Sequence, residues 1–94
     1  MAYSHVVFFR LHDPSRVDEA AAMLETLRGN VPSLREVEVG LDDSPSDRSS
    51  HLCLITRFED RAGYEAYHHH PFHQELLSRF VPLVAEARKV DWGH

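Results

Sequence analysis

The hydrophobic residues near the start of the chain recur with the period of two that marks a β-strand. Residues 4–11 (SHVVFFRL) are rich in valine and phenylalanine, which suit a pleated sheet. Alternation gives this predicted strand two apolar faces, one with His5, Val7, Phe9 and Leu11 and the other with Val6 and Phe8. Because both faces are apolar, we expect both to be covered.

The next segment changes to helical spacing. Asp13 is a suitable N-cap and Pro14 suits the first helical position, while Gly29 is the residue at which the helix should end. Between them lies one apolar stripe, formed by Val17, Ala20, Ala21, Leu24 and Leu27. The pattern therefore predicts a helix packed through a single face.

Two more strands follow this helix. Val37, Val39 and Leu41 alternate with polar residues or glycine, which is typical of a half-exposed strand. Residues 51–59 (HLCLITRFE) form a third strand, again apolar on both faces.

A broken helix and a last strand complete the pattern. The residue before a proline is disfavoured in the helical region, so a helix capped by Asp60 should end near His70. Pro71 should open a third helix that runs toward Val84. A short fourth strand is expected over residues 86–92.

The resulting order predicts an α+β fold with a four-stranded antiparallel sheet and helices on one face, in a single domain over residues 1–94. The opposite face would carry Val6, Phe8, Cys53 and Ile55 and would be wet in a monomer. Contiguous apolar surface usually marks an interface. We therefore expect a homodimer that packs sheet against sheet.

Composition narrows the class of protein. The formal net charge of −5 argues against a nucleic-acid binder, which would usually be basic. No apolar run is long enough to span a membrane and the first residues do not resemble a signal peptide, so a cytoplasmic protein without membrane contacts is expected. Cys53 is the one cysteine, and its apolar surroundings predict a buried, unreactive thiol.

Residues 66–73 (AYHHHPFH) hold four of the eight histidines. His70 and His73 have a spacing that suits metal ligands, but structural zinc sites usually need four ligands, so no metal or other cofactor is expected. The alternative role for His70 or His73 is to cap backbone groups freed by the helix break. His68 and His69 point about 100° apart in a helix and are expected to face solvent without a role.

Four segments in order resemble the stress-responsive A/B barrel family, the dimeric α+β barrel proteins. They are HVVFFRL, VPSLREVEVG, LITRFEDRAGYEAYHHHPFH and FVPLV followed by VDW. The element formed by His70, Pro71 and His73 after a tyrosine is the most specific part. The resemblance implies a ferredoxin-like fold and a dimer whose two sheets close a central barrel.

The family includes olivetolic acid cyclase, a plant enzyme that closes a linear polyketide by an intramolecular aldol condensation. The resemblance implies catalytic roles for His5, Tyr67 and His73 and a pocket-lining role for Val7. The plant enzyme has bulky residues in its first helix where this chain has alanines 20–22, so its substrate is not carried over. The residues expected to contact a ligand are Val7, Phe9, Leu24, Leu54 and His70.

Two main hypotheses about function remain open, and a metal-binding module at His70 and His73 is a third, weaker one. Aldol or lyase chemistry needs a base with a pKa near neutrality, a donor for the enolate oxygen and a dry pocket. In the first hypothesis, a small, mostly apolar carbonyl compound binds between sheet and helices and meets such groups. In the second, the protein is a stress-related structural or binding protein without catalysis, and the space over His5 is filled by Phe9, Leu24, Leu54 and Phe80.

Overall fold

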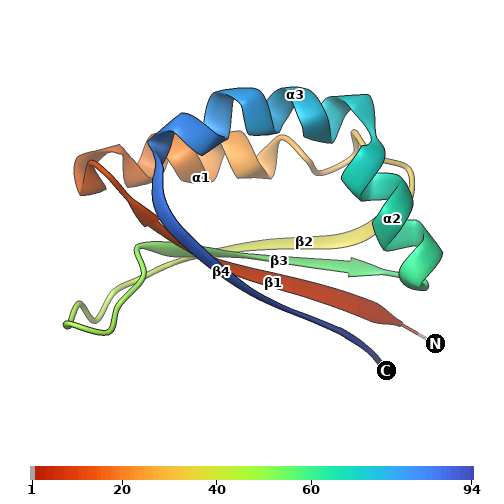
Figure 1. Ribbon diagram of the computed structural model, residues 1–94, viewed down its shortest axis with the longest axis horizontal. Helices are drawn as coiled ribbons and strands as arrows, with labels where there is room; N and C mark the ends of the chain where they lie inside the picture. Colours follow the sequence, from red (N-terminus) through yellow and green to blue (C-terminus); the bar gives the residue numbers. More distant parts are fainter. Residues whose placement is uncertain (1) are drawn as a thin grey trace.

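The computed structural model describes residues 2–94, in which three helices cover one face of an antiparallel sheet (Figure 1). The sheet has the strand order β2-β3-β1-β4, with every neighbouring pair antiparallel. This is the α+β, ferredoxin-like arrangement that the sequence predicts. The elements in chain order are β1 (Tyr3–Leu11), the 3₁₀ turn η1 (Pro14–Arg16), α1 (Val17–Glu25), β2 (Leu34–Leu41), β3 (Leu52–Phe58), α2 (Arg61–His69), α3 (Pro71–Phe80), the 3₁₀ turn η2 (Val81–Leu83) and β4 (Val84–Gly93).

The first helical segment is shorter than the predicted span of 13–29. Asp13 caps the turn η1 by accepting a hydrogen bond of 3.0 Å from the backbone N–H of Ser15. Past the end of α1, the backbone N–H groups of residues 26–28 bond three residues back, which winds the chain too tightly for an α-helix. Gly29 then reverses the chain with a φ of 80°, a left-handed conformation that glycine adopts without strain.

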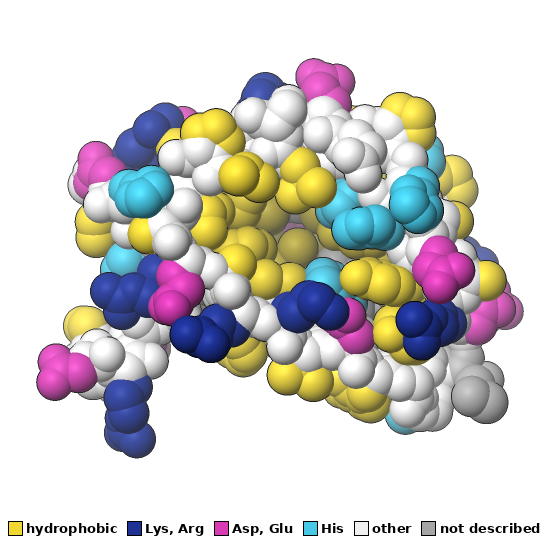
Figure 2. All heavy atoms as spheres, in the orientation of Figure 1, with side chains coloured by type: hydrophobic (Ala, Val, Ile, Leu, Met, Phe, Trp, Pro, Cys, Tyr) yellow, Lys and Arg dark blue, Asp and Glu magenta, His cyan; other side chains and the backbone are white. Residues whose placement is uncertain are grey.

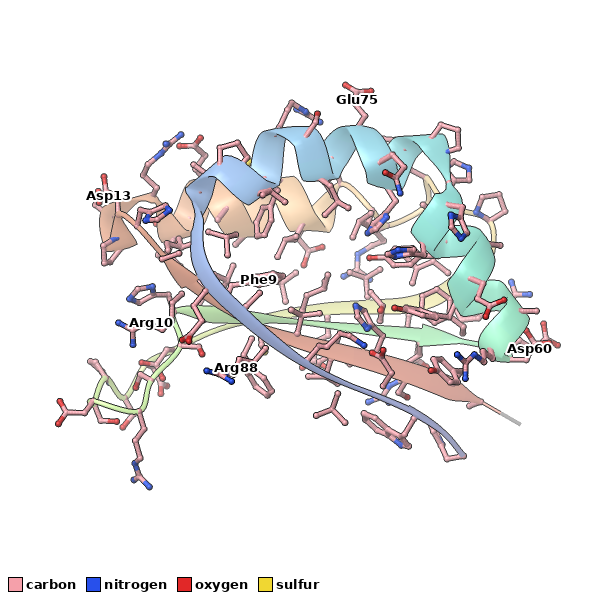
Figure 3. The ribbon with its side chains drawn as sticks, viewed as in Figure 1. Phe9, Arg10, Asp13, Asp60, Glu75 and Arg88 are labelled. Atoms are coloured by element: carbon pink, nitrogen blue, oxygen red, sulfur yellow. The ribbon has the colours of Figure 1, made fainter. Side chains whose placement is uncertain are left out.

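The core lies between the sheet and the helical layer. The inner face of the sheet contributes Val7 and Phe9 from the central strand β1, and the Phe9 ring meets Phe80 of α3 edge-on with centroids 4.9 Å apart. Figure 3 places the labelled Phe9 between the sheet and the helices. Burial of this face holds the helices on one side and determines which side chains can form an interior site.

The opposite face of the sheet carries apolar side chains that this chain leaves open. Phe8, Val90 and Trp92 are 44%, 56% and 40% exposed. Cys53 also belongs to this face and is half-buried, which corrects the prediction of a buried thiol. The thiol is less buried than expected because the helices cover only the other side of β3.

The last strand begins earlier than predicted, at Val84, because α3 ends at Phe80 and the turn η2 brings the chain back beneath it. As an edge strand, β4 pairs along the whole of β1 and places Asp91 directly across from His5.

The start of α2 offers a test of the local structure. The Asp60 side chain accepts a hydrogen bond of 2.8 Å from the backbone N–H of Gly63. We expect Asp60→Ala to lower the free energy of unfolding by about 1 kcal/mol, because one backbone donor loses its partner. Asp60→Asn should lower it by much less, since the amide oxygen can still accept. Urea denaturation measures both values, and equal losses for the two variants would contradict the capping role.

Candidate active site

A cavity of about 210 Å³ lies between the inner face of the sheet and the helices. Figure 2 shows its opening as a hollow with hydrophobic walls, with histidine side chains gathered at one rim and basic side chains at another. The lining side chains are His5, Val7, Phe9, Leu24, Leu27, Leu54, Tyr64, Tyr67, His68, His73, Leu76, Leu77, Phe80 and Lys89. Seven of the eight residues that the sequence singles out therefore face one space, which Phe9, Leu24, Leu54 and Phe80 line and do not fill.

His5 enters the cavity from β1, and a carboxylate on the neighbouring strand holds its ring. Its Nδ1 is hydrogen-bonded to Oδ1 of Asp91, and the two side chains are 11% and 13% exposed. Burial acts to raise the pKa of Asp91, but hydrogen bonds from Lys89 and His5 outweigh it and lower that pKa below its ordinary value. Because an ionised carboxylate can only accept, the proton of a neutral His5 ring lies on Nδ1 and Nε2 keeps its lone pair.

His73 lies at the start of α3, and a backbone carbonyl holds its ring. Its Nδ1 lies 3.1 Å from the carbonyl oxygen of His68, and this oxygen can only accept a hydrogen bond. The neutral ring therefore carries its proton on Nδ1 and leaves Nε2 as a base. Burial lowers the pKa of His73 from its ordinary value, and the neighbouring histidines 5, 68 and 70 lower it further against the effect of the carbonyl.

Tyr67 is almost fully buried at 1% exposure and packs against His73 with ring centroids 4.3 Å apart. Burial raises its pKa well above the ordinary value, so the phenol stays protonated at every physiological pH. Every fully buried side-chain nitrogen or oxygen within residues 2–94 has a hydrogen-bond partner. The Tyr67 hydroxyl makes no hydrogen bond in that part of the chain, so its oxygen is not fully buried, and the Tyr67 side chain lines the cavity.

Sequence reasoning missed four residues of this site: Tyr64, His68, Lys89 and Asp91. The Tyr64 ring packs at a tilt against His5 with centroids 5.0 Å apart and lies 6.3 Å from Tyr67, so it lies between these two residues. Together with Tyr67 and His68 it recurs at positions i, i+3 and i+4 of α2, a helical spacing that would have identified the common face. His68 is exposed as predicted, but it lines the cavity and its carbonyl orients His73.

His70 does not line the cavity, in contrast to its expected contact with a ligand. Its backbone is extended, and its Nδ1 accepts a hydrogen bond of 3.1 Å from the backbone N–H of Phe72. The ring therefore caps α3 and faces the helix break. Residues 2–94 contain no group of three or more potential metal ligands.

A larger and more open hollow of about 730 Å³ lies on the outer face of the sheet, beneath the segment of residues 42–51. Its walls include Phe8 and Arg88, and Figure 3 shows Arg88 on the side of the sheet away from the helices. None of the histidines or tyrosines discussed above contributes to it. By volume alone this hollow would be the better candidate for a ligand site. The histidines and tyrosines lie in the smaller cavity, which is therefore the candidate active site.

Comparison with known proteins agrees with the fold described above. The model of the stress responsive A/B barrel domain family matches residues 4–93. A stress-response A/B barrel domain-containing protein of Arabidopsis thaliana is 27% identical over 94 residues, covering 96% of this chain and 84% of the relative. None of the helices within residues 2–94 is long and apolar enough to cross a membrane.

Two solved structures share the fold. A dimeric ferredoxin-like protein of unknown function from Thermobifida fusca has a TM-score of 0.85 and 24% identity, covering 100% of this chain and 92% of its own. The hydroxynitrile lyase from Passiflora edulis has a TM-score of 0.83 and 18% identity, covering 97% of this chain and 91% of its own. At these identities the similarity establishes the fold alone.

The lowered pKa of His73 predicts a specific loss of stability in acid. The unfolded chain takes up a proton near the ordinary pKa of 6.5, whereas the folded ring does so only at lower pH. The wild type should therefore lose stability as the pH falls below about 6.5, and His73→Gln should lose less. Urea denaturation at pH 7.5 and 5.5 measures this difference.

The exposed neighbour His69 supplies the matched control. His69→Gln should keep the pH dependence of the wild type, because its ring lies outside the cavity lining. If His69→Gln and His73→Gln changed the pH dependence equally, the buried neutral state of His73 would be refuted.

Proposed function

The chain belongs to the stress responsive A/B barrel family, and we propose that it is a homodimeric member that performs acid/base chemistry on a small, mostly apolar carbonyl compound. The reaction class is aldol or lyase chemistry, in which a proton next to a carbonyl group is removed or returned. The observation that carries the proposal is that His5 and His73 face one apolar cavity with Nδ1 held by an acceptor, beside a protonated tyrosine.

His73 is the general base. Its lowered pKa keeps the ring neutral at physiological pH, and the His68 carbonyl leaves Nε2 as its free basic nitrogen. A general base must present its lone pair to the substrate proton, and this tautomer does so without rearrangement.

Tyr67 stabilises the charge that this step creates. When the proton leaves, negative charge develops on the carbonyl oxygen, and a preorganised donor stabilises it most strongly away from water. The Tyr67 hydroxyl meets this need because it stays protonated and its ring is held against His73 and Phe58, with centroids 4.3 and 5.1 Å away.

His5 is the second acid/base group, and Asp91 is its positioning residue. The carboxylate fixes the ring and would stabilise an imidazolium formed during the reaction. Tyr64 lies between His5 and Tyr67. His5 would therefore contact the end of a bound substrate that is farther from Tyr67 and His73.

The electron pairs balance without a cofactor. Nε2 of His73 takes the α-proton, the C–H electrons form the enolate, and the enolate carbon attacks a second carbonyl group to form a carbon–carbon bond. The new alkoxide takes a proton from an imidazolium, which restores the neutral base. The reverse sequence is lyase chemistry, and the hydroxynitrile lyase from Passiflora edulis, which has the same fold, supports the proposal of this class.

The cavity restricts the substrate by size and polarity. A dry cavity of about 150 Å³ holds a benzene ring, so about 210 Å³ suits a compound with one ring or a short alkyl chain. Val7, Phe9, Leu24 and Leu54 supply apolar walls that favour such a body.

The dimer is proposed from the other face of the sheet. Phe8, Val90 and Trp92 leave an apolar surface open there, opposite the cavity, and solved relatives in fold are dimeric ferredoxin-like proteins. A second copy packed on this surface would close a central barrel and leave the cavity of each protomer accessible.

Proton exchange tests the chemistry without knowledge of the natural substrate. We expect the protein to accelerate deuterium uptake at the carbon next to the carbonyl of phenylacetone in D₂O, measured by proton NMR. His73→Asn should slow this exchange by about 100-fold or more, because the base is lost. Tyr67→Phe should slow it by about 100-fold, because the enolate oxygen loses its donor.

His69→Asn is the control, since its ring lies outside the cavity lining. It should exchange at the wild-type rate. Binding of phenylacetone without any acceleration would favour the alternative of a non-catalytic binding protein, and equal losses in all three variants would refute the assigned roles.

Size-exclusion chromatography with light scattering tests the dimer. Phe8→Glu should convert the dimer to a monomer, because it places a charge in the proposed apolar interface. Val81→Glu is the matched control, since Val81 is 57% exposed on η2 outside the outer face of the sheet. A monomeric wild type, or dissociation by both variants, would contradict this interface.

A further inference from the structure

The one lysine of the chain lies at the mouth of the cavity. Lys89 is the only lysine among ten basic residues, and it lies on the edge strand β4 across from Val7 of the inner strand. Its side chain is 59% exposed and also lines the cavity. The amine therefore sits where a ligand would meet solvent.

The polar part of the cavity lining consists of basic and phenolic side chains. The titratable side chains that line it are His5, His68, His73 and Lys89, with the two tyrosines, and no aspartate or glutamate is among them. Asp91 lies behind this wall, where its two oxygens bind His5 and Lys89. A protonated amine has three donors, so the bond to Asp91 leaves two for a ligand.

The Lys89 amine could act either as a nucleophile or as a cation that binds an anion. A lysine that attacks a carbonyl carbon must lose its proton, which requires a lowered pKa. The hydrogen bond with Asp91 instead raises the pKa of Lys89 above its ordinary value. The amine is thus a permanent cation, suited to hold an anion and unsuited to form a Schiff base.

We infer that the cavity selects a ligand with a carboxylate at one end, bound by Lys89 at the mouth, and an apolar body that extends inward. This inference rests on the proposed function. It specifies the substrate as an apolar oxo-acid whose carbonyl group lies deeper in the cavity, near His73 and Tyr67. His68 also lines the cavity, and its ring lies 5.7 Å from His73 and 6.1 Å from Tyr64, between centroids. Apolar walls alone would not discriminate an acid from its neutral analogue.

A pair of probes of equal shape tests the inference. Benzoate and benzamide share one ring and differ in charge, and both fit the cavity by size. Calorimetric titration of the wild-type protein should show benzoate binding about tenfold more tightly, because a charge-assisted hydrogen bond is the stronger one. Lys89→Met should abolish this preference, and Lys89→Arg should retain most of it.

Arg79→Met is the matched control for net charge, since Arg79 is an exposed residue of α3 that does not line the cavity. It should keep the preference for benzoate. Because Lys89 is the single lysine, ligand binding at its amine can be followed directly by NMR. After reductive ¹³C-methylation, which keeps the positive charge, the signal of Lys89 should shift when benzoate is added and should not shift with benzamide.

The outcomes separate this inference from the proposed function. Equal binding of both probes to the wild type would overturn the carboxylate preference and leave a site for neutral carbonyl compounds. A benzoate preference that survives in Lys89→Met, with an unmoved lysine signal, would place the anion elsewhere and also overturn it. If neither probe bound, the inference and the proposed cavity site would fail together.

Discussion

The site depends on one backbone carbonyl that the helix break leaves without its usual partner. In a continuous helix the His68 oxygen would accept from the N–H of residue 72, but that N–H donates to the His70 ring. The oxygen is instead bound by the His73 ring at 3.1 Å and by the Gln74 side chain at 2.6 Å. A carbonyl freed at a helix break takes other donors, so the break that Pro71 imposes also fixes the tautomer and the direction of His73.

The two faces of the sheet differ: the inner face borders the cavity, and the outer face presents an open apolar surface. Helices cover the inner face incompletely near the edge strand β4, and this edge is where Figure 2 shows the hollow. The outer face stays apolar and open, with Phe8 and Val90 among its exposed residues. Because the two faces point in opposite directions, a partner can bind one face without closing the site on the other.

Three titratable groups in the cavity are constrained by a neighbouring group or by burial. Asp91 holds His5, the His68 carbonyl holds His73, and burial keeps Tyr67 protonated. Polar groups in an apolar cavity are costly unless they are hydrogen-bonded or open to water or a ligand. This constraint explains how a small cavity with few polar groups could hold the proposed acid/base site.

Local rules made much of the protein predictable from its sequence. Period-two and helical spacing identified the strands, the inner face with His5 and Val7, and the helix break at Pro71, because these features depend on residues a few positions apart. Family resemblance added Tyr67 and His73, which do line the cavity with His5. The start of β4 was misplaced by two residues, since boundaries depend on where the preceding helix packs.

The tertiary structure alone decided which distant groups meet. Asp91 and Lys89 reach the site only through the register of β4 against β1, which joins residues 86 positions apart, as in the contact of His5 with Asp91. His70 turned away from the cavity because a backbone N–H at the break needed its ring as an acceptor. The sequence by itself thus determined the order of the elements and the face that each side chain takes, through short-range periodicity. Strand register and the satisfaction of buried backbone groups, which depend on the whole fold, decided the composition of the site.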